Sequence, residues 1–124
     1  MTGWKDEYFS EATVNGVAKG YLIAARLRIS DIDNWCRGSL AYNGDDVSVR
    51  PESEQAVRWC SLGALLHAAN GFEDKPKCYQ RAVGFITNVA RNKYGLFVAD
   101  VNDNMEHDDV LQMFDEAIAL ASGD

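Results

Sequence analysis

Cysteine and histidine are the residue types in this chain that could support nucleophilic or metal chemistry. The chain contains Cys36, Cys60, Cys78, His67 and His107. A cysteine becomes a nucleophile when an imidazole, a cation or a helix N-terminus lowers its pKa. A thiol site here would use Cys36 or Cys60 with His107. Asp103 or Asn102, four or five residues before that histidine, would complete the site.

Both cysteines also have a structural interpretation. Cys60 lies about two turns into a predicted helix, where the helix dipole has faded, and between Trp59 and Leu62 it is typical of a small buried apolar residue. Cys36 is expected in a loop beside Arg37. There, Trp35 would fill the core and Gly38 would supply an unusual backbone angle. The structural interpretation is favoured for both thiols, and no catalytic residue is assigned.

A zinc site is not expected, although the donor types would suit one. Cys36, Cys60, His67 and His107 lack the C-x-x-C or H-x-x-x-H spacing of such sites. Within one helix, Cys60 and His67 would be separated by roughly 10 Å of rise. We therefore predict no metal and no cofactor, and expect His67 to be a core or helix-end residue.

A recognition surface is the third kind of site that the residues allow. The segment around Trp35, Arg37 and Tyr42 has the residue types that dominate interface hot spots, although both aromatic rings could instead reach the core. The Asn102-Asp103 pair could form a site or cap a helix. The binding residues that we predict are Trp35, Arg37, Asn102, Asp103, His107, Asp108, Asp115 and Glu116.

The charge is distributed unevenly along the chain. The formal net charge is -7, and residues 94–124 contain 8 acidic residues and no Lys or Arg. A chain of this kind is a poor binder of nucleic acid, whose affinity depends on basic side chains. Two interpretations remain: the acidic end attracts a protein partner with a basic surface, or it only keeps the protein soluble.

The chain has the features expected of a cytoplasmic protein that does not enter the membrane. Three cysteines are an odd number, and the N-terminal residues 1–10 lack the apolar stretch of a signal peptide. The longest apolar stretches, such as Leu62 to Leu66, are far too short to span a bilayer. These observations predict reduced thiols and a cytoplasmic location.

Length and periodicity predict a mainly α-helical, compact single domain over residues 1–124, with a loosely ordered segment at 1–10. The chain has 124 residues, of which 47% are apolar. Four helices are expected. They run from Thr13 to Ile29, from a Ser53 N-cap to Ala69 at the centre of the fold, from an Asp74 N-cap to Lys93, and from Glu106 to Ala121.

Two stretches have no helical periodicity. Between Ser30 and Pro51, turn-forming residues predominate, and Asn43-Gly44 suits a type I′ turn that would allow one short β-hairpin. Val47 to Val49 could be a very short strand. The apolar segment from Leu96 to Val101 could be a strand or a buried connector, and its periodicity does not decide between them.

Three segments taken together resemble a family of small uncharacterised proteins of bacteria and their phages. They are Asn34-Trp35-Cys36-Arg37-Gly38, then Ala56 to Leu65 with its Trp-Cys-x-x-Gly-Ala-Leu motif, then Val101-Asn102-Asp103 followed by a final amphipathic helix that begins near His107. The resemblance extends from Tyr21 to Ala121. It implies a domain identity and no activity.

One position departs from that family's pattern. A Thr usually precedes the histidine of the last segment, whereas this chain has Glu106 there. Glu is a weaker N-cap than Thr. We therefore expect Asn102, Asp103 or Asn104 to take over the cap, and Asp103 with Glu106 also fits a variant of the capping box.

These observations favour a non-catalytic binding protein of bacterial or phage origin that engages a basic protein surface through its acidic end. Two alternatives stay open. One is a small thiol-dependent enzyme that uses Cys36 or Cys60 with His107. The other is a small-ligand-binding domain with a pocket between the central helix and the Asn102-Asp103 turn. The residues leave open whether the protein is an enzyme, although the lack of a strong catalytic motif argues against it.

Overall fold

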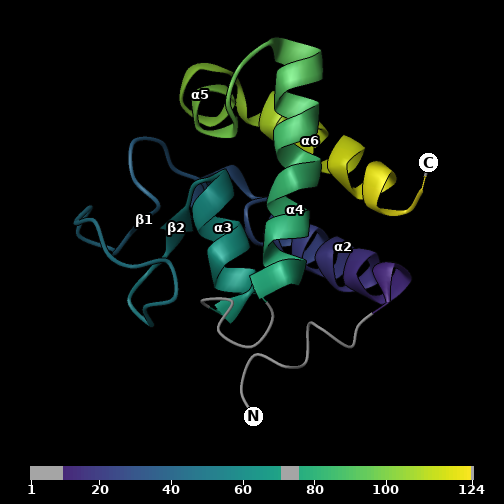
Figure 1. Ribbon diagram of the computed structural model, residues 1–124. Helices are drawn as coiled ribbons and strands as arrows, with labels where there is room; N and C mark the ends of the chain where they lie inside the picture. The colour runs from purple at the N-terminus through teal and green to yellow at the C-terminus, as the bar shows by residue number, and fades with distance from the viewer. Residues whose placement is uncertain (1–9, 71–75, 124) are drawn as a thin grey trace.

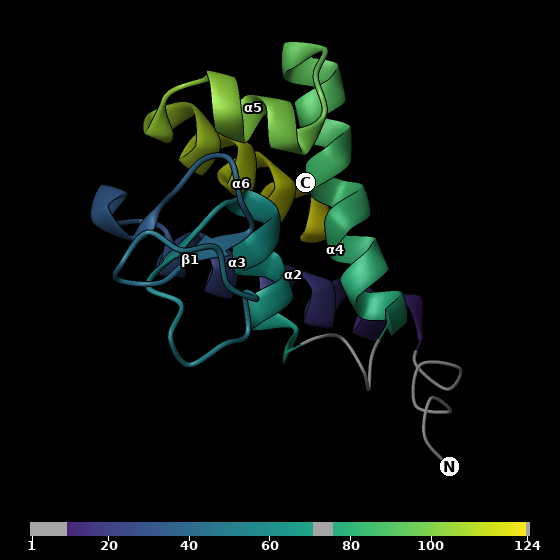
Figure 2. The same ribbon diagram turned by 90° about the vertical axis from the view of Figure 1, so that its left-hand side faces the viewer.

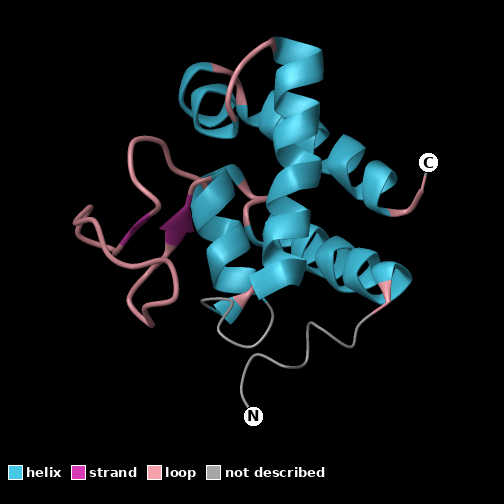
Figure 3. Ribbon diagram, viewed as in Figure 1, coloured by secondary structure: helices cyan, strands magenta, loops and turns pink. Residues whose placement is uncertain are grey.

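The computed structural model describes residues 10–70 and 76–123, and this part of the chain is mainly helical (Figure 3). The α-helices are α2 (Glu11–Arg28), α3 (Ser61–Ala68), α4 (Pro76–Val89), α5 (Val98–Asn104) and α6 (His107–Ala121). The mainly α fold is confirmed, with five α-helices rather than four among the described residues. The segment expected to be loosely ordered lies almost entirely outside them.

Helix α2 is at the centre of the packing. It contacts α3, α4 and α6, and α4 also packs against α6 (Figures 1 and 2). Each of these helices supplies one of the largest fully buried side chains, namely Leu22, Leu65, Ile86 and Phe114. None of the described helices is long and apolar enough to cross a bilayer.

The prediction of a helix from Thr13 to Ile29 is confirmed. Ser10 caps α2, because its Oγ accepts a hydrogen bond from the backbone N–H of Thr13 at 3.1 Å. The buried positions Val14, Ala18, Leu22 and Ala25 recur every three or four residues, so they form one apolar face.

The prediction of a central helix starting at Ser53 is wrong. Helix α3 begins at Ser61 with Cys60 as its N-cap, and Ser53 instead accepts from the N–H of Gln55 in a turn. The residues before Cys60 form strand β2 (Arg58–Trp59), which pairs antiparallel with β1 (Ala41–Tyr42). The apolar run predicted as helix contains no strong signal to stop, and tertiary pairing with the 41–42 segment decided its conformation.

The predicted hairpin turn is also wrong. A type I′ turn needs a positive φ at both of its central residues, which would be Asn43 and Gly44. Neither has a positive φ, and the residue of this loop that does is Asp46, at 60°. Asn43 instead accepts hydrogen bonds at its Oδ1 from the N–H groups of Asp45 and Val47. The strand expected over Val47–Val49 is reduced to one isolated bridge between Tyr42 and Ser48.

The third predicted helix, from Asp74 to Lys93, is present, but its last turn is π-helical rather than α-helical. Helix α4 continues into a π-helical turn, η3 (Ala90–Tyr94), and ends at Gly95, whose φ is 68°. That end agrees with the predicted stop near Lys93. The predicted N-cap, Asp74, lies outside the described residues.

The segment from Leu96 to Val101, for which the sequence allowed a strand or a buried connector, is neither of these. Phe97 is the extended N-cap of α5, and the helix continues from Val98 through the Asn102-Asp103 pair. The cap expected to move away from Glu106 stays there. The Glu106 side chain accepts from the N–H of Asp109, and the Asp109 carboxylate accepts from the N–H of Glu106 at 3.2 Å.

The sheet and the loops of residues 30–60 lie on one side of α3, away from α4 (Figures 1 and 2). A short 3-10 helix, η1 (Ile32–Asn34), leads from α2 into this region. Gly63 allows the region to sit against α3. A Cβ built at Gly63 would lie 1.9 Å from the carbonyl oxygen of Leu40. No larger residue fits at this contact.

Candidate functional site

The two Trp-Cys dipeptides of the chain lie side by side. Trp35 and Trp59 form an isolated parallel bridge, and the N–H of Cys36 donates to the carbonyl of Trp59 at 3.1 Å. We call the four residues Trp35, Cys36, Trp59 and Cys60 the Trp-Cys junction. Segments that are distant in sequence therefore meet at one place.

Asn102 joins this junction to α3 and α5. Its Oδ1 accepts from the indole N–H of Trp35 at 2.8 Å, from the backbone N–H of Ser61 at 2.9 Å and from the Ser61 hydroxyl at 2.8 Å. Its Nδ2 donates to the carbonyl of Cys36 at 3.0 Å and to the Asp103 carboxylate at 3.1 Å. The Asn102 side chain is buried. Because it accepts the first N–H of α3, a residue of α5 caps the start of α3.

Arg37 and Asp103 complete the same connection. The Arg37 Nε donates to the carbonyl of Asn102 at 3.2 Å, and its guanidinium also donates to the carbonyl of Met105. Asp103 accepts from the N–H of Gly38 at 3.2 Å. These contacts tie the 35–38 turn to the C-terminal end of α5, where carbonyl groups lack partners within the helix.

Each junction tryptophan contacts an arginine and a histidine. The Arg37 guanidinium carbon is 4.8 Å from the centre of the Trp35 ring, and the His107 ring is 5.1 Å from it on centroids. The Nε2–H of His107 donates to the carbonyl of Ile29 at 2.6 Å. Because a carbonyl only accepts, this contact requires the proton on Nε2.

The second tryptophan repeats the arrangement. The Arg28 guanidinium carbon is 4.8 Å from the centre of the Trp59 ring, and the His67 ring lies 5.3 Å away. Pro51 supplies its carbonyl to both the Trp59 indole N–H and the His67 Nδ1–H, each at 2.9 Å. His67 lies in the last turn of α3, so it is a helix-end residue as expected.

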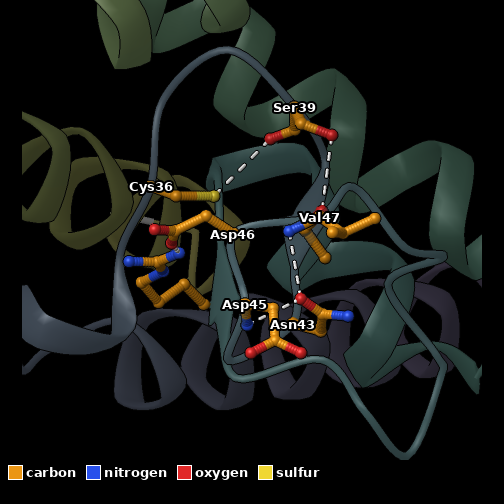
Figure 4. Close-up of polar contacts among 8 residues, drawn as sticks. Cys36, Ser39, Asn43, Asp45, Asp46 and Val47 are labelled. Carbon is orange, nitrogen blue, oxygen red and sulfur yellow. Dashed lines mark hydrogen bonds and ion pairs between the residues drawn. The ribbon is translucent and has the colours of Figure 1, made fainter.

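Cys36 is buried at the start of the 36–39 turn. Its thiol donates to the carbonyl of Ser39 at 3.6 Å (Figure 4). Burial away from water, and the proximity of Cys60, raise the pKa of the Cys36 thiol to about 12. The group is therefore a neutral thiol at physiological pH.

Cys60 is the N-cap of α3, whereas the sequence predicted it about two turns inside that helix. Its Sγ accepts from the N–H of Gly63 at 3.3 Å, yet burial raises the pKa of the Cys60 thiol despite that hydrogen bond. Cys60 borders a small cavity of about 230 Å³ between the 38–40 turn, α3 and α5. The lining residues are Gly38, Ser39, Leu40, Cys60, Leu62, Ala99, Asn102 and Asp103.

The structure does not bring the predicted thiol and imidazole partners together. In the described residues, neither junction thiol is hydrogen-bonded to an imidazole: Cys36 contacts Ser39, Cys60 contacts Gly63, and His107 contacts Ile29. No group of three His, Cys, Asp or Glu side chains within reach of one metal ion occurs among the residues that the structure describes.

Two of the three α6 carboxylates that were predicted to bind a partner form ion pairs within the chain instead. Asp115 forms a two-point contact with Arg26 on α2, with its shortest distance at 2.7 Å. Glu116 pairs with Lys93 at the end of η3. Asp108, in contrast, is exposed, with no ion pair among those found in the described chain.

A larger open groove, which was not predicted from the sequence, lies beside Trp59. Its volume is about 610 Å³, and its lining residues are Ala24, Leu27, Arg28, Asn34, Ala56, Val57 and Trp59. Two of these apolar side chains are well exposed, Leu27 at 71% and Val57 at 45%, and nearby Ile32 in η1 is 58% exposed. We call this surface the α2 groove.

Three residues of the site were not predicted from the sequence, because they act through contacts that no local pattern reveals. They are Arg28, Pro51 and Ser61. Ser61 and Pro51 hold the junction, and Arg28 covers Trp59. One signal was available in the sequence: the Trp-Cys pair occurs twice. Leu27 does not follow the spacing of the buried α2 positions, which are Val14, Ala18, Leu22 and Ala25, so it was a candidate surface residue.

A family model matches residues 16–120, which include the junction and all five described α-helices except the ends of α2 and α6. The chain belongs to a family of unknown function (DUF6197). No curated protein and no solved structure matches it. Membership of DUF6197 agrees with the resemblance to an uncharacterised family, and it assigns no activity.

Proposed function

We propose that this protein is a non-catalytic binding protein that engages another protein through the α2 groove. The observation that carries the proposal is the exposure of Leu27 and Val57 in the lining of one open groove, with Ile32 also exposed two residues before the lining residue Asn34. Large apolar side chains gathered on one face, rather than scattered singly, are typical of protein contact sites. Arg28 and the nearby Asn34 supply polar groups within that surface.

The state of the junction supports a binding role over catalysis. Its polar groups are engaged within the chain, and burial keeps both thiols neutral. A catalytic cysteine needs the opposite, namely an exposed thiol with a lowered pKa. The geometry therefore gives less support to a thiol-dependent enzyme using Cys36 or Cys60 with His107.

We infer that the partner carries net positive charge around an apolar contact. The net charge of -7 attracts such a surface at long range, while Leu27 and its neighbours make the close contact. Asp115 and Glu116 act in this scheme through the overall field, because their carboxylates already pair with Arg26 and Lys93. The family resemblance and the odd number of cysteines support a bacterial or phage protein of the cytoplasm.

The test compares two surface leucines. Full-length protein and its Leu27→Ser variant serve as baits in lysate of the source organism, with Leu120→Ser, on α6, as the matched control. We expect a protein retained by the wild type and by Leu120→Ser but not by Leu27→Ser. Titration of that purified partner must then show binding that depends on Leu27. Retention of the same proteins by all three baits would overturn the proposal.

The small cavity beside Cys60 supports a second candidate function. It lies between the start of α3 and the Asn102-Asp103 pair, where a small-ligand site was predicted. Thermal-shift screening against nucleotides, metal ions and metabolites tests it. A ligand that raises the melting temperature of the wild type but not of Ala99→Trp, which would fill the cavity, would support it. No shift with any ligand would count against it.

A further inference from the structure

The Asn43-Gly44 pair does not form the predicted type I′ turn, and the Asn43 side chain is instead folded over the backbone that follows it (Figure 4). Its Oδ1 accepts from the N–H of Asp45 at 2.9 Å and from the N–H of Val47 at 3.0 Å. The ring closed by the first of these hydrogen bonds contains the Gly44 nitrogen. The amide carbon of Asn43 is therefore held beside the peptide bond that joins it to Gly44.

Three features favour attack by the Gly44 nitrogen on that amide carbon. The Gly44 N–H donates no hydrogen bond within the part of the chain that the structure describes. Gly44 is exposed and has no side chain to hinder its nitrogen. The two N–H groups on Oδ1 would stabilise the negative charge that develops there when the nitrogen adds to the carbon, as the donors of an oxyanion hole do.

We propose that Asn43 is a self-modification site, which loses ammonia to its own backbone and becomes aspartate or isoaspartate. The two reacting atoms belong to adjacent residues, so covalent geometry keeps them within reach of each other. The site is independent of the α2 groove, because neither Asn43 nor Gly44 lines that groove.

The chemistry balances with water as the co-reactant. The Gly44 nitrogen forms a bond to the Asn43 Cγ and gives up its proton, while the bond from Cγ to the amide nitrogen breaks. The leaving group takes up that proton and departs as ammonia, and a cyclic succinimide remains. Water then opens the ring. Breaking the bond to Cγ gives aspartate, and breaking the bond to the main-chain carbonyl carbon gives isoaspartate. One amide and one water thus become one carboxylic acid and one ammonia.

A second Asn-Gly pair supplies a comparison within the same chain. Asn15 and Gly16 lie inside α2, where each backbone N–H donates to a carbonyl one turn earlier. The Asn15 side chain is turned toward another helix, because its Oδ1 accepts from Arg81 on α4 at 2.6 Å. This pair has the same residues, but its nitrogen is engaged and its amide is held away from that nitrogen. The remaining pair, Asn70-Gly71, ends outside the described residues.

The two products differ in their effect on the loop. Both add a negative charge beside Asp45 and Asp46, and isoaspartate also adds a methylene group to the main chain. At present the N–H of Asn43 donates to the carbonyl of Val47 at 2.9 Å, and its carbonyl accepts from the N–H of Asp46 at 3.1 Å. A longer main chain breaks this pattern, so isoaspartate loosens the loop after β1, whereas aspartate keeps an acceptor oxygen in the same place.

The test uses the purified full-length chain, incubated at mildly alkaline pH and mapped over time by peptide mass spectrometry. Electron-transfer fragmentation distinguishes isoaspartate from aspartate. We expect isoaspartate to form at Asn43 of the folded protein about tenfold or more faster than at Asn15, because α2 must open locally before Asn15 can react. Equal rates at the two positions, aspartate at 43 without isoaspartate, or an unchanged Asn43 would each overturn the proposal.

Gly44→Ala is the matched variant. Gly44 has no positive φ, and a Cβ at this position meets nothing within 4 Å, so the loop keeps its conformation while a methyl group hinders the nitrogen. We expect slower modification at Asn43 and an unchanged rate at Asn15. In denaturant the two asparagines of the wild type should react at similar rates, because only the fold separates them. A rate at Asn43 that Gly44→Ala leaves unchanged would contradict the assigned nucleophile. Failure to find a Leu27-dependent partner would leave these results unchanged.

Discussion

Asn102 connects more segments than any other residue of the candidate site. It is 1% exposed, and its side chain forms hydrogen bonds with Trp35, Cys36 and Ser61. A primary amide suits this position because it both donates and accepts. Its role is therefore to fix the relative placement of the 35–38 turn, α3 and α5.

Replacement of Asn102 by Ala should destabilise the protein strongly. The Trp35 indole N–H and both donors of Ser61 would lose their acceptor, at about 1–3 kcal/mol for each buried group left without a partner. We expect a loss of about 3–5 kcal/mol in the free energy of unfolding, measured by urea denaturation. Asn104→Ala, an exposed position on the same helix, should change it by less than about 0.5 kcal/mol. Equal effects would contradict this role.

The junction thiols should react faster as the pH rises. Burial raises the pKa of both Cys36 and Cys60, so at pH 7 almost all of each group is the unreactive neutral thiol. Below its pKa, the thiolate fraction grows about tenfold per pH unit. Iodoacetamide labelling of the folded protein should therefore accelerate up to at least pH 9, and labelling in denaturant should be much faster at pH 7. A plateau near pH 7 would instead indicate an activated cysteine.

At the scale of elements, the start of α3 depends on contacts from outside the helix. Cys60 caps it, Asn102 on α5 accepts from its first N–H, and the Leu40 backbone lies against Gly63. These contacts explain why the helix begins at Ser61 although the apolar pattern continues upstream. An early start would remove β2 and the pairing of the two tryptophans.

Gly63→Ala should disrupt this contact. Its methyl group would meet the Leu40 backbone, which no rotamer change can relieve, so we expect a loss of about 3 kcal/mol or more in unfolding free energy. Gly84→Ala is the matched control, because a Cβ at this helical position in α4 meets nothing within 4 Å. That change should stabilise the protein by about 0.5–1 kcal/mol. Thermal or urea unfolding of both variants measures the difference, and similar values would contradict the packing.

At the scale of the whole molecule, charge acts mainly at a distance. The acidic residues of α6 are exposed or partly exposed, and two of them hold α6 to α2 and η3. Surface ion pairs of this kind contribute little to stability, about 0–1 kcal/mol. Their larger effect is on the field that a charged partner meets.

The association rate of the Leu27-dependent partner should therefore fall with salt. Changing Asp108, Asp115 and Glu116 to Asn, Asn and Gln removes three negative charges, and should lower the on-rate and its salt dependence. Stopped-flow measurement at two ionic strengths tests this. Leu27→Ser is the contrasting variant and should change mainly the dissociation rate. An unchanged on-rate in the charge variant would remove the electrostatic part of the proposal.

The sequence by itself determined the helices whose signals are local. The period of α2, the stop at Gly95 and the apolar face of α6 all follow from residues within one or two turns of each other. The same holds for the mainly helical class and for the uneven charge. These features depend on side-chain spacing and backbone angles, which short segments fix.

Only the tertiary structure decided the start of α3, the helical state of α5 and the composition of the site. Cys36, Cys60 and Asn102 were candidates from their residue types, but their partners come from segments up to 67 residues away, as in the bond from Trp35 to Asn102. An apolar run such as 56–66 satisfies a helix or a strand equally well. Pairing with distant backbone and the satisfaction of buried polar groups select between them, and no local pattern encodes either.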